Sequence, residues 1–292
     1  MGILSNLIIS VIIKASMYTL MGMGLALVFG VMKISNFAHG ECYMMGAYIA
    51  YVTSSILKLG AIPTIIIAPV AAFFIGILIE KITFAPLRKH NKSDWLLNTF
   101  LLTAGLQLIL QNIAQLIFGG QYLGVQQMFN WNLKIGGLAV SGDRVVAVIV
   151  SFVTIGAFWW FMKKTKTGNA ITAVSQNETG AIIVGVNIKR IHSITFALST
   201  ALAAVAGASL ISVIPAYPTM GTAPLLKSWS ILILVGLNNT AGTLLGGFIV
   251  AAVEVVSVYL FGTVWQESIT FIMIIIVLIF KPNGIFGKSL KV

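Results

Sequence analysis

Long apolar stretches separated by short polar breaks run through almost the whole chain. A helix that crosses the lipid core of a membrane needs about 20 mostly apolar residues. The apolar runs cover residues 3–32, 42–57, 61–82, 95–118, 145–162, 194–214, 228–237, 243–261 and 269–280. They predict an all-α polytopic membrane protein with about eight or nine transmembrane helices, some broken or short. Since no soluble domain interrupts the pattern, residues 1–292 form a single transmembrane domain.

The composition supports this class. Hydrophobic residues make up 58% of the 292 residues and charged residues 9%, with a mean hydropathy of +1.00. Soluble domains carry about 25% charged residues. In lipid, the backbone must satisfy its own hydrogen bonds, which favours helices. The net charge of +11 gathers in the loops between apolar runs, as expected beside a lipid bilayer, so it does not indicate a nucleic-acid partner.

Lysine and arginine divide the loops into two sets, which predicts an orientation. Thirteen of the 18 lie in one set, whose members include the 83–94 loop, the 163–193 segment and the C-terminal tail. Four lie in the other set, and Lys14 lies within a span. Basic loops stay in the cytoplasm. The 163–193 segment and the C-terminus are therefore predicted to be cytoplasmic, and the N-terminus to be outside.

The 163–193 segment is a long polar stretch between two apolar runs, and we interpret it as a coupling loop. Small residues recur along it with helical spacing, and a short helix of this kind can seat in a groove on a partner protein. The other interpretation is a solvated loop without a partner. The candidate contact residues are Ala173, Asn177, Ala181, Gly185, Asn187 and Arg190.

The first polar break between apolar runs contains a second set of candidates: Asn36, His39, Gly40 and Glu41. Ionisable groups at membrane depth usually face protein or a water-filled cavity, so these residues are candidates for a translocation pathway or a hinge. The alternative is an ordinary cytoplasmic turn, in which Glu41 favours the start of the next helix.

A second break follows the short run 228–237, at Asn238 and Asn239. A short apolar segment that ends in polar residues is typical of the discontinuous helices found beside transport pathways. The glycines Gly242 and Gly246 come next, and their spacing indicates close helix packing.

Two buried or interfacial carboxylates remain. Glu254 lies inside an apolar run, where we expect either a polar neighbour such as Lys14 or backbone and hydroxyl partners. Glu80 and Lys81 stand at a helix end, and we interpret them as anchors at the membrane interface.

The sequence shows no catalytic or cofactor motif. The three histidines have no spacing typical of paired metal ligands. Gly287-Lys288-Ser289 imitates the end of a phosphate-binding loop, but Pro282 stands where its first glycine belongs. We therefore expect no enzyme activity, no metal and no cofactor in this chain, and any ATP would be bound by partner subunits.

Several short motifs, taken in order, resemble one known family. They are Gly30-Val31-Met32, Asn36-Phe37-Ala38-His39-Gly40-Glu41, Gly46-Ala47-Tyr48, Glu80-Lys81, Pro86-Leu87-Arg88, Thr167-Gly168, Gly185-Val186-Asn187, Arg190, Ala206-Gly207, Leu234-Val235-Gly236, Gly242, Gly246-Gly247 and Pro282-Asn283-Gly284-Ile285-Phe286-Gly287. The set resembles the permease subunits of bacterial and archaeal ABC importers for branched-chain amino acids, over essentially the whole chain.

This resemblance implies a permease in the prokaryotic plasma (inner) membrane, with the translocation pathway formed together with a second homologous permease subunit. It further implies two cytoplasmic ABC ATPase subunits on the coupling loops and an extracytoplasmic amino-acid-binding protein that delivers the cargo. Thr179-Gly180 departs from the family's helix-favouring residues, which leaves the length of the coupling helix open. Urea, short amides or another amino acid are alternative cargoes, and a stand-alone secondary transporter or channel is the alternative from another class.

Overall fold

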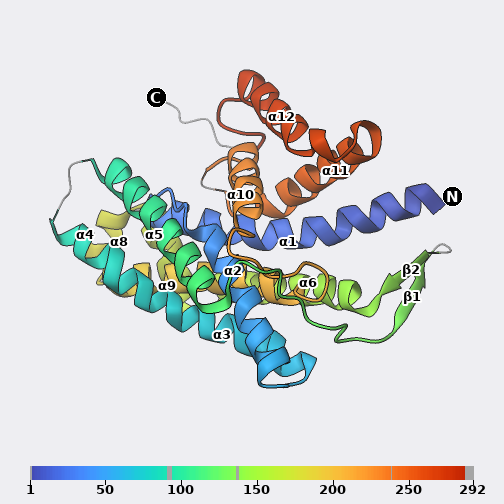
Figure 1. Cartoon of the computed structure of the whole chain (residues 1–292). Coiled ribbons are helices and arrows are strands. Elements are labelled where there is room, and N and C mark those ends of the chain that lie inside the picture. Colours follow the sequence, from blue (N-terminus) through green and yellow to red (C-terminus); the bar gives the residue numbers. More distant parts are fainter. Residues whose placement is uncertain (1, 91–93, 136–137, 238, 287–292) are drawn as a thin grey trace.

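The computed structural model describes residues 2–90, 94–135, 138–237 and 239–286, and it is built almost entirely of helices (Figure 1). The helices are α1 (Gly2–Met32), α2 (His39–Tyr51), α3 (Ala61–Ile79), α4 (Ala85–His90), α5 (Trp95–Phe118), α6 (Gly142–Lys164), α7 (Lys166–Gln176), α8 (Glu178–Ile183), α9 (Ile188–Ser209), α10 (Thr222–Val235), α11 (Thr243–Phe261) and α12 (Gln266–Phe280). Short π-helical turns cover Val52–Ile56 and Glu80–Phe84, a 3-10 turn covers Thr263–Trp265, and the strands are β1 (Asn132–Ile135) and β2 (Leu138–Ser141).

Within these described ranges, seven helical stretches are long and apolar enough to cross a membrane, and α10 is a shorter apolar helix. The prediction of an all-α polytopic membrane protein is therefore confirmed. The helix α2 continues directly into the π-helical turn Val52–Ile56, but the polar residues at its start, His39 and Glu41, make this stretch less apolar than the seven. This stretch and α10 account for the difference between the seven spans and the eight or nine expected.

Burial separates central helices from peripheral ones. In α1 and α9 most of the membrane-length window is buried inside the chain, 78% in each. The corresponding share is 22% for the stretch that contains α3, 17% for α5 and 11% for the stretch that ends in α12. Because the exposed residues of these outer helices are mostly large and apolar, they are suited to contact lipid or another membrane subunit.

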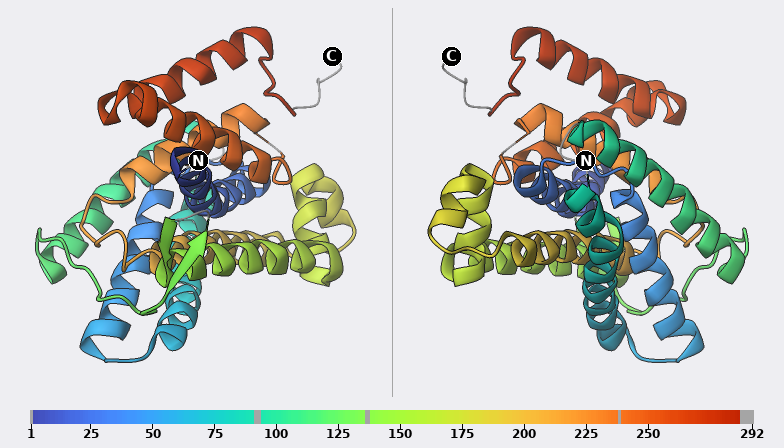
Figure 2. Two further views of the ribbon diagram at one scale, coloured as in Figure 1. Left: turned by 90° about the vertical axis from the view of Figure 1, so that its right-hand side faces the viewer. Right: turned by 90° about the vertical axis from the view of Figure 1, so that its left-hand side faces the viewer.

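The two sets of loops defined by charge lie toward opposite ends of the molecule. The start of α1 and the β1–β2 hairpin share one end, whereas α4 and α8 lie at the other (Figure 1). The helices α7 and α8 project from one edge of the bundle, beyond the end of α6 (Figure 2). For these four elements, the fold agrees with the predicted grouping of the loops.

Glycines set the closest helix contacts, because any side chain there would collide with a neighbouring backbone. A Cβ atom on Gly46 of α2 would lie 2.3 Å from the Ala204 carbonyl oxygen of α9, and one on Gly207 would lie 2.1 Å from the Tyr43 carbonyl oxygen. Gly242 and Gly246 instead lie against the side chain of Val235 of α10, whose methyl groups an added Cβ would meet at 2.3 and 2.4 Å. The prediction that this last pair marks helix packing is confirmed.

Two elements differ from the expected pattern. The helix α10 begins at Thr222, within a stretch that reads as a proline-rich loop, because Pro224 lies in the first helical turn, where no backbone N–H is needed. The long, nearly uncharged loop after α5 holds the antiparallel β1–β2 hairpin, with Asn132 opposite Ser141. Four-residue strands are too short to leave a clear alternating pattern in the sequence.

Candidate functional site: the broken helices and the coupling loop

The first polar break is a segment that turns back into the protein. The chain reverses at Lys33, which has a left-handed backbone with φ of 54°, and runs without helix to Ala38. It then brings His39 beside Met21, whose carbonyl oxygen lies 2.9 Å from His39 Nε2. At 1.5 Å per residue, Met21 lies about 16 Å from the end of α1. The break is therefore not an ordinary surface turn, although Glu41 does lie in the first turn of the next helix, as that alternative expected.

Neighbouring helices satisfy the backbone groups that this break exposes. The Thr103 hydroxyl on α5 donates to the Ser35 carbonyl at 2.9 Å, and the Trp95 indole N–H donates to the Met32 carbonyl at 3.3 Å. The side chain of Asn36, which is 1% exposed, accepts the Ala38 N–H at 3.1 Å. Non-helical backbone at membrane depth is tolerated only where protein or a cavity surrounds it, and this segment meets that condition.

The four candidate residues of the break end up in different surroundings. The His39 ring spans from α1 to α9, since its Nδ1 lies 3.3 Å from the Ser199 hydroxyl. Gly40 touches the segment before α10, where an added Cβ would lie 2.3 Å from the Gly221 carbonyl oxygen. The starts of α2 and α10 therefore meet inside the protein, a relation that the sequence does not reveal.

Glu41 is fully buried in the first turn of α2. Its Oε1 accepts a hydrogen bond of 2.9 Å from the Gln111 amide on α5. Its Oε2 has no hydrogen-bond partner among the residues that the structure describes. Gln111 is a polar residue inside an apolar run, and that is the signal by which sequence analysis would have found it.

At the second break, Asn238 lies outside the described residues. Asn239 has a local structural role, because its side-chain oxygen accepts a hydrogen bond of 3.0 Å from the Gly242 N–H just before α11. Its amide donates to the Phe286 carbonyl at 3.4 Å, which ties the break to the C-terminal segment. The Ile285 N–H also donates to the Leu234 carbonyl of α10 at 2.7 Å. A place for Asn239 in the pathway or in a hinge stays a prediction.

The coupling loop is well organised by helix caps. Asn177 begins α8 and accepts the Gly180 N–H at 2.9 Å, and Asn187 begins α9 and accepts the Arg190 N–H at 3.1 Å. Gly185 ends α8 with φ of 85°, a conformation that favours glycine. Thr179-Gly180, which differ from the helix-favouring residues of the family that the sequence resembles, still lie in a helix, since α8 runs from Glu178 to Ile183.

The exposed surface of this loop differs in part from the one expected. Ala181 is only 3% exposed and packs within its own chain, so its side chain is not available to a partner, and that part of the expectation is wrong. Ala173 is half-buried. The other four candidates, Asn177, Gly185, Asn187 and Arg190, are exposed. The three residues after Ala181 are exposed as well and form an apolar tip: Ile182 at 56%, Ile183 at 80% and Val184 at 76%.

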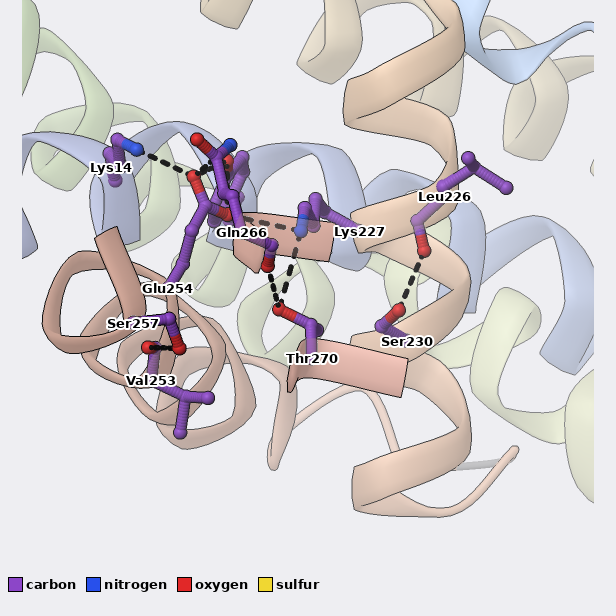
Figure 3. A network of polar contacts seen from close by, with 10 residues as sticks. Lys14, Leu226, Lys227, Ser230, Val253, Glu254, Ser257, Gln266 and Thr270 are labelled. Carbon is purple, nitrogen blue, oxygen red and sulfur yellow. Dashed lines mark hydrogen bonds and ion pairs between the residues drawn. The ribbon is translucent and has the colours of Figure 1, made fainter. Parts of the chain in front are cut away.

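Glu254 joins four helices through a polar cluster that sequence analysis only partly anticipated (Figure 3). Its Oε1 accepts from Lys14 of α1 at 2.5 Å and from Gln266 of α12 at 2.8 Å. Its Oε2 accepts from Tyr18 at 2.8 Å and lies 3.3 Å from the Lys227 ammonium of α10. Lys14 is thus confirmed as a partner. Lys227 was missed because its loop-like sequence context placed it outside the membrane helices.

Glu80 is not an interfacial anchor, because its side chain is fully buried. It lies in the π-helical turn after α3, pairs with Arg88, and accepts a hydrogen bond from Ser193 of α9. The carboxylate therefore links two helices near the coupling loop. The expectation failed because position at the end of an apolar run does not tell which way a side chain points.

Comparison with known proteins gives a consistent result. Residues 7–278 match the family model described as branched-chain amino acid transport system / permease component. The chain is 29% identical to the high-affinity branched-chain amino acid transport system permease protein BraD of Pseudomonas aeruginosa, over 94% of this chain and 92% of the relative. It is 28% identical to LivH of Escherichia coli over the same shares, and 30% identical to the probable LivH of Methanocaldococcus jannaschii over 96% and 91%. The chain therefore belongs to the family of branched-chain amino acid transport system permeases.

Proposed function

We propose that this protein is a permease subunit of an ABC importer and forms part of the pathway by which branched-chain amino acids cross the membrane. Its relatives carry that role in their names, and they align along almost the full length of the chain. Energy would come from ATP bound and hydrolysed by two separate ATPase subunits, with an extracytoplasmic binding protein delivering the cargo and a second homologous permease completing the pathway.

The proposal that separate ATPase subunits drive transport rests on the apolar tip at the end of α8. Ile182, Ile183 and Val184 are exposed at an edge of the bundle, beside the basic residues Lys189 and Arg190. Exposed apolar side chains rimmed by charge are typical of a docking surface for another protein. Because α7 packs against α6, α8 and α9, a push on this tip would be passed to α6 and α9.

The proposed location is the prokaryotic plasma (inner) membrane, with the C-terminus and the 163–193 segment in the cytoplasm. The charge bias of the loops supports this orientation. The structure adds that the basic α4 end and α8 lie together, away from the start of α1 and the β1–β2 hairpin (Figure 1).

The hypothesised mechanism is alternating access. The parts that would rearrange are the broken segment Asn36–Glu41 and the helix α10, whose starting segments touch at Gly40 and Gly221. A non-helical segment of this kind can change its backbone conformation without disrupting a helix, and broken helices are typical of transporters. Movement of α9 would reach the break directly, since Ser199 lies beside His39.

Purification of the tagged chain from its host in mild detergent tests the assembly. We expect a phosphate-binding-loop ATPase and a second permease to co-purify, and Val184→Asp to reduce recovery of the ATPase while the second permease is retained. Thr179→Ser, a conservative change at the start of α8, is the control. Recovery of the chain alone from several detergents, or unchanged ATPase recovery with Val184→Asp, would contradict the proposal.

A further inference from the structure

A cavity of about 360 Å³ lies among α1, α2, α6, α10, α11 and α12, on the side of Glu254. Its size falls in the range of about 300–1,000 Å³ that is typical of small-molecule sites. Helices far apart in the sequence contribute to it, so it exists only in the folded protein. The lining residues on which the argument depends are Lys14, Tyr43, Arg144, Tyr217, Lys227 and Glu254.

The charge of the lining is unbalanced. Three cationic side chains, Lys14, Arg144 and Lys227, face a single carboxylate, Glu254. Glu254 already accepts from Lys14, Tyr18 and Gln266 and lies beside Lys227. The cavity therefore has a surplus of two positive charges and no free carboxylate of its own, which favours a ligand that brings a negative group.

Hydrogen-bond donors remain available for that group. Lys227 is 3% exposed and has two neighbours at 3.3 Å, Glu254 and Thr270, so one of its three N–H donors is unused among the described residues (Figure 3). The Arg144 guanidinium forms no ion pair with any part of the chain that the structure describes. The guanidinium fork matches carboxylate geometry, with two parallel N–H bonds.

The rest of the cavity is suited to a zwitterion with an aliphatic tail. The phenol of Tyr43, on a side chain only 1% exposed, has no hydrogen-bond partner in the described ranges and can accept from an ammonium group, as can that of Tyr217. One wall is aliphatic and comes from the segment between α9 and α10. Its members are Leu210, Val213, Ile214 and Met220.

We infer that this cavity is a transient binding site for the cargo on its way through the permease, and that Lys227 and Arg144 hold the carboxylate of an aliphatic amino acid. Glu254 acts as a positioning residue, because it holds both lysines toward the cavity. The inference rests on the proposed function for the identity of the cargo. With the proposed orientation, the ends of α6, α10 and α11 that form the cavity face the outside, from which cargo arrives.

Binding of radiolabelled leucine to the purified importer, without ATP or binding protein, tests the site. We expect 4-methylpentanoate, which keeps the carboxylate and tail, to compete, and leucinol, which lacks the carboxylate, not to compete. Arg144→Gln and Lys227→Gln should each weaken leucine binding at least about tenfold, the loss of one charge-assisted contact. Lys134→Gln on the β1 strand removes the same charge away from the cavity and should leave binding unchanged.

A second variant tests the cavity without changing any charge and without altering the buried Lys227, whose substitution could also affect folding. Ala223 lines the cavity and is exposed, so Ala223→Leu adds volume in the cavity without entering the core. We expect it to abolish leucine binding while the importer stays assembled. Wild-type binding in this variant, equal competition by leucinol, or full affinity in Arg144→Gln would each overturn the inference.

Failure of the cavity and failure of the proposed function give different results. If the wild-type importer takes up leucine with ATP but the cavity variants keep its KM, the cavity inference is overturned and the function stands. If the wild-type importer takes up no leucine, the proposed cargo is wrong. The cavity is then judged by 4-methylpentanoate alone: binding lost in Arg144→Gln supports it, and no binding to the wild type overturns it.

Discussion

The exchange of Glu254 for glutamine should cost much of the stability of the α1–α10–α11–α12 region. Glutamine keeps the shape of the side chain but removes the charge, which leaves Lys227, 3% exposed, without a counter-ion. Removing one partner of a buried ion pair costs about 3–5 kcal/mol. The other lysine, Lys14, has a side chain that is 34% exposed, so water replaces part of its contact and the lower end of the range, about 3 kcal/mol, applies.

Thermal unfolding of the purified chain in detergent measures this cost. At roughly 2–4 °C per kcal/mol for a chain of this size, the midpoint should fall by about 6–12 °C. Lys227→Met in the Glu254→Gln background should recover at least about 1 kcal/mol, because the buried charge is then gone. Glu267→Gln, at an exposed position one residue beyond Gln266, is the matched control and should change little. A midpoint for Glu254→Gln within 1 °C of wild type would refute the reasoning.

Three further predictions concern glycines and the coupling tip. Gly46→Leu should prevent accumulation of folded protein, since even a Cβ would meet the Ala204 carbonyl, whereas Gly30→Ala, with nothing within 4 Å, should express normally; comparable expression of the two would contradict the packing. Gly185→Ala should lower the free energy of unfolding by about 1 kcal/mol, because alanine is disfavoured at φ of 85°, and an unchanged value in chemical unfolding would count against the cap. Ile183→Asp should leave the unfolding midpoint nearly unchanged, since the residue is 80% exposed, but should uncouple ATP hydrolysis from uptake; normal uptake would count against the docking tip.

The positions of the long helices followed from the sequence because lipid imposes a length of apolar chain on each of them. The Gly242 and Gly246 contact was predictable for a related reason: close packing in a membrane requires small residues at helical spacing. In α1, small residues recur at every fourth position, at Gly22, Ala26 and Gly30. This row marks close packing only in part, since a Cβ on Gly22 would meet Ile231 whereas one on Gly30 would meet nothing within 4 Å.

The polar residues were harder to place, because their partners come from other parts of the chain. A polar hexapeptide such as Asn36–Glu41 fits both a surface turn and a buried re-entrant segment, and the Thr103 and Gln111 contacts from α5 show the second. Lys227 lies beside prolines, so hydropathy assigns it to a loop. In the structure Pro224 begins a helix that carries Lys227 to Glu254.

Ala181 illustrates a further limit. Helical spacing shows which residues share a face, but it does not show whether that face turns toward the same chain or toward a partner. The apolar tip at Ile182–Val184 becomes visible only once α8 is placed against α9 and its buried side is known.

Reconstitution into liposomes tests the central claim most directly. The chain, its co-purified permease and ATPase, and the cognate binding protein would be assembled in the liposomes. Leucine uptake would then be followed with and without ATP on the side of the membrane that carries the ATPase. The account predicts uptake that requires ATP and the binding protein and that is lost when the ATPase is omitted. Uptake by this chain alone, without ATP, would contradict it and favour a stand-alone carrier.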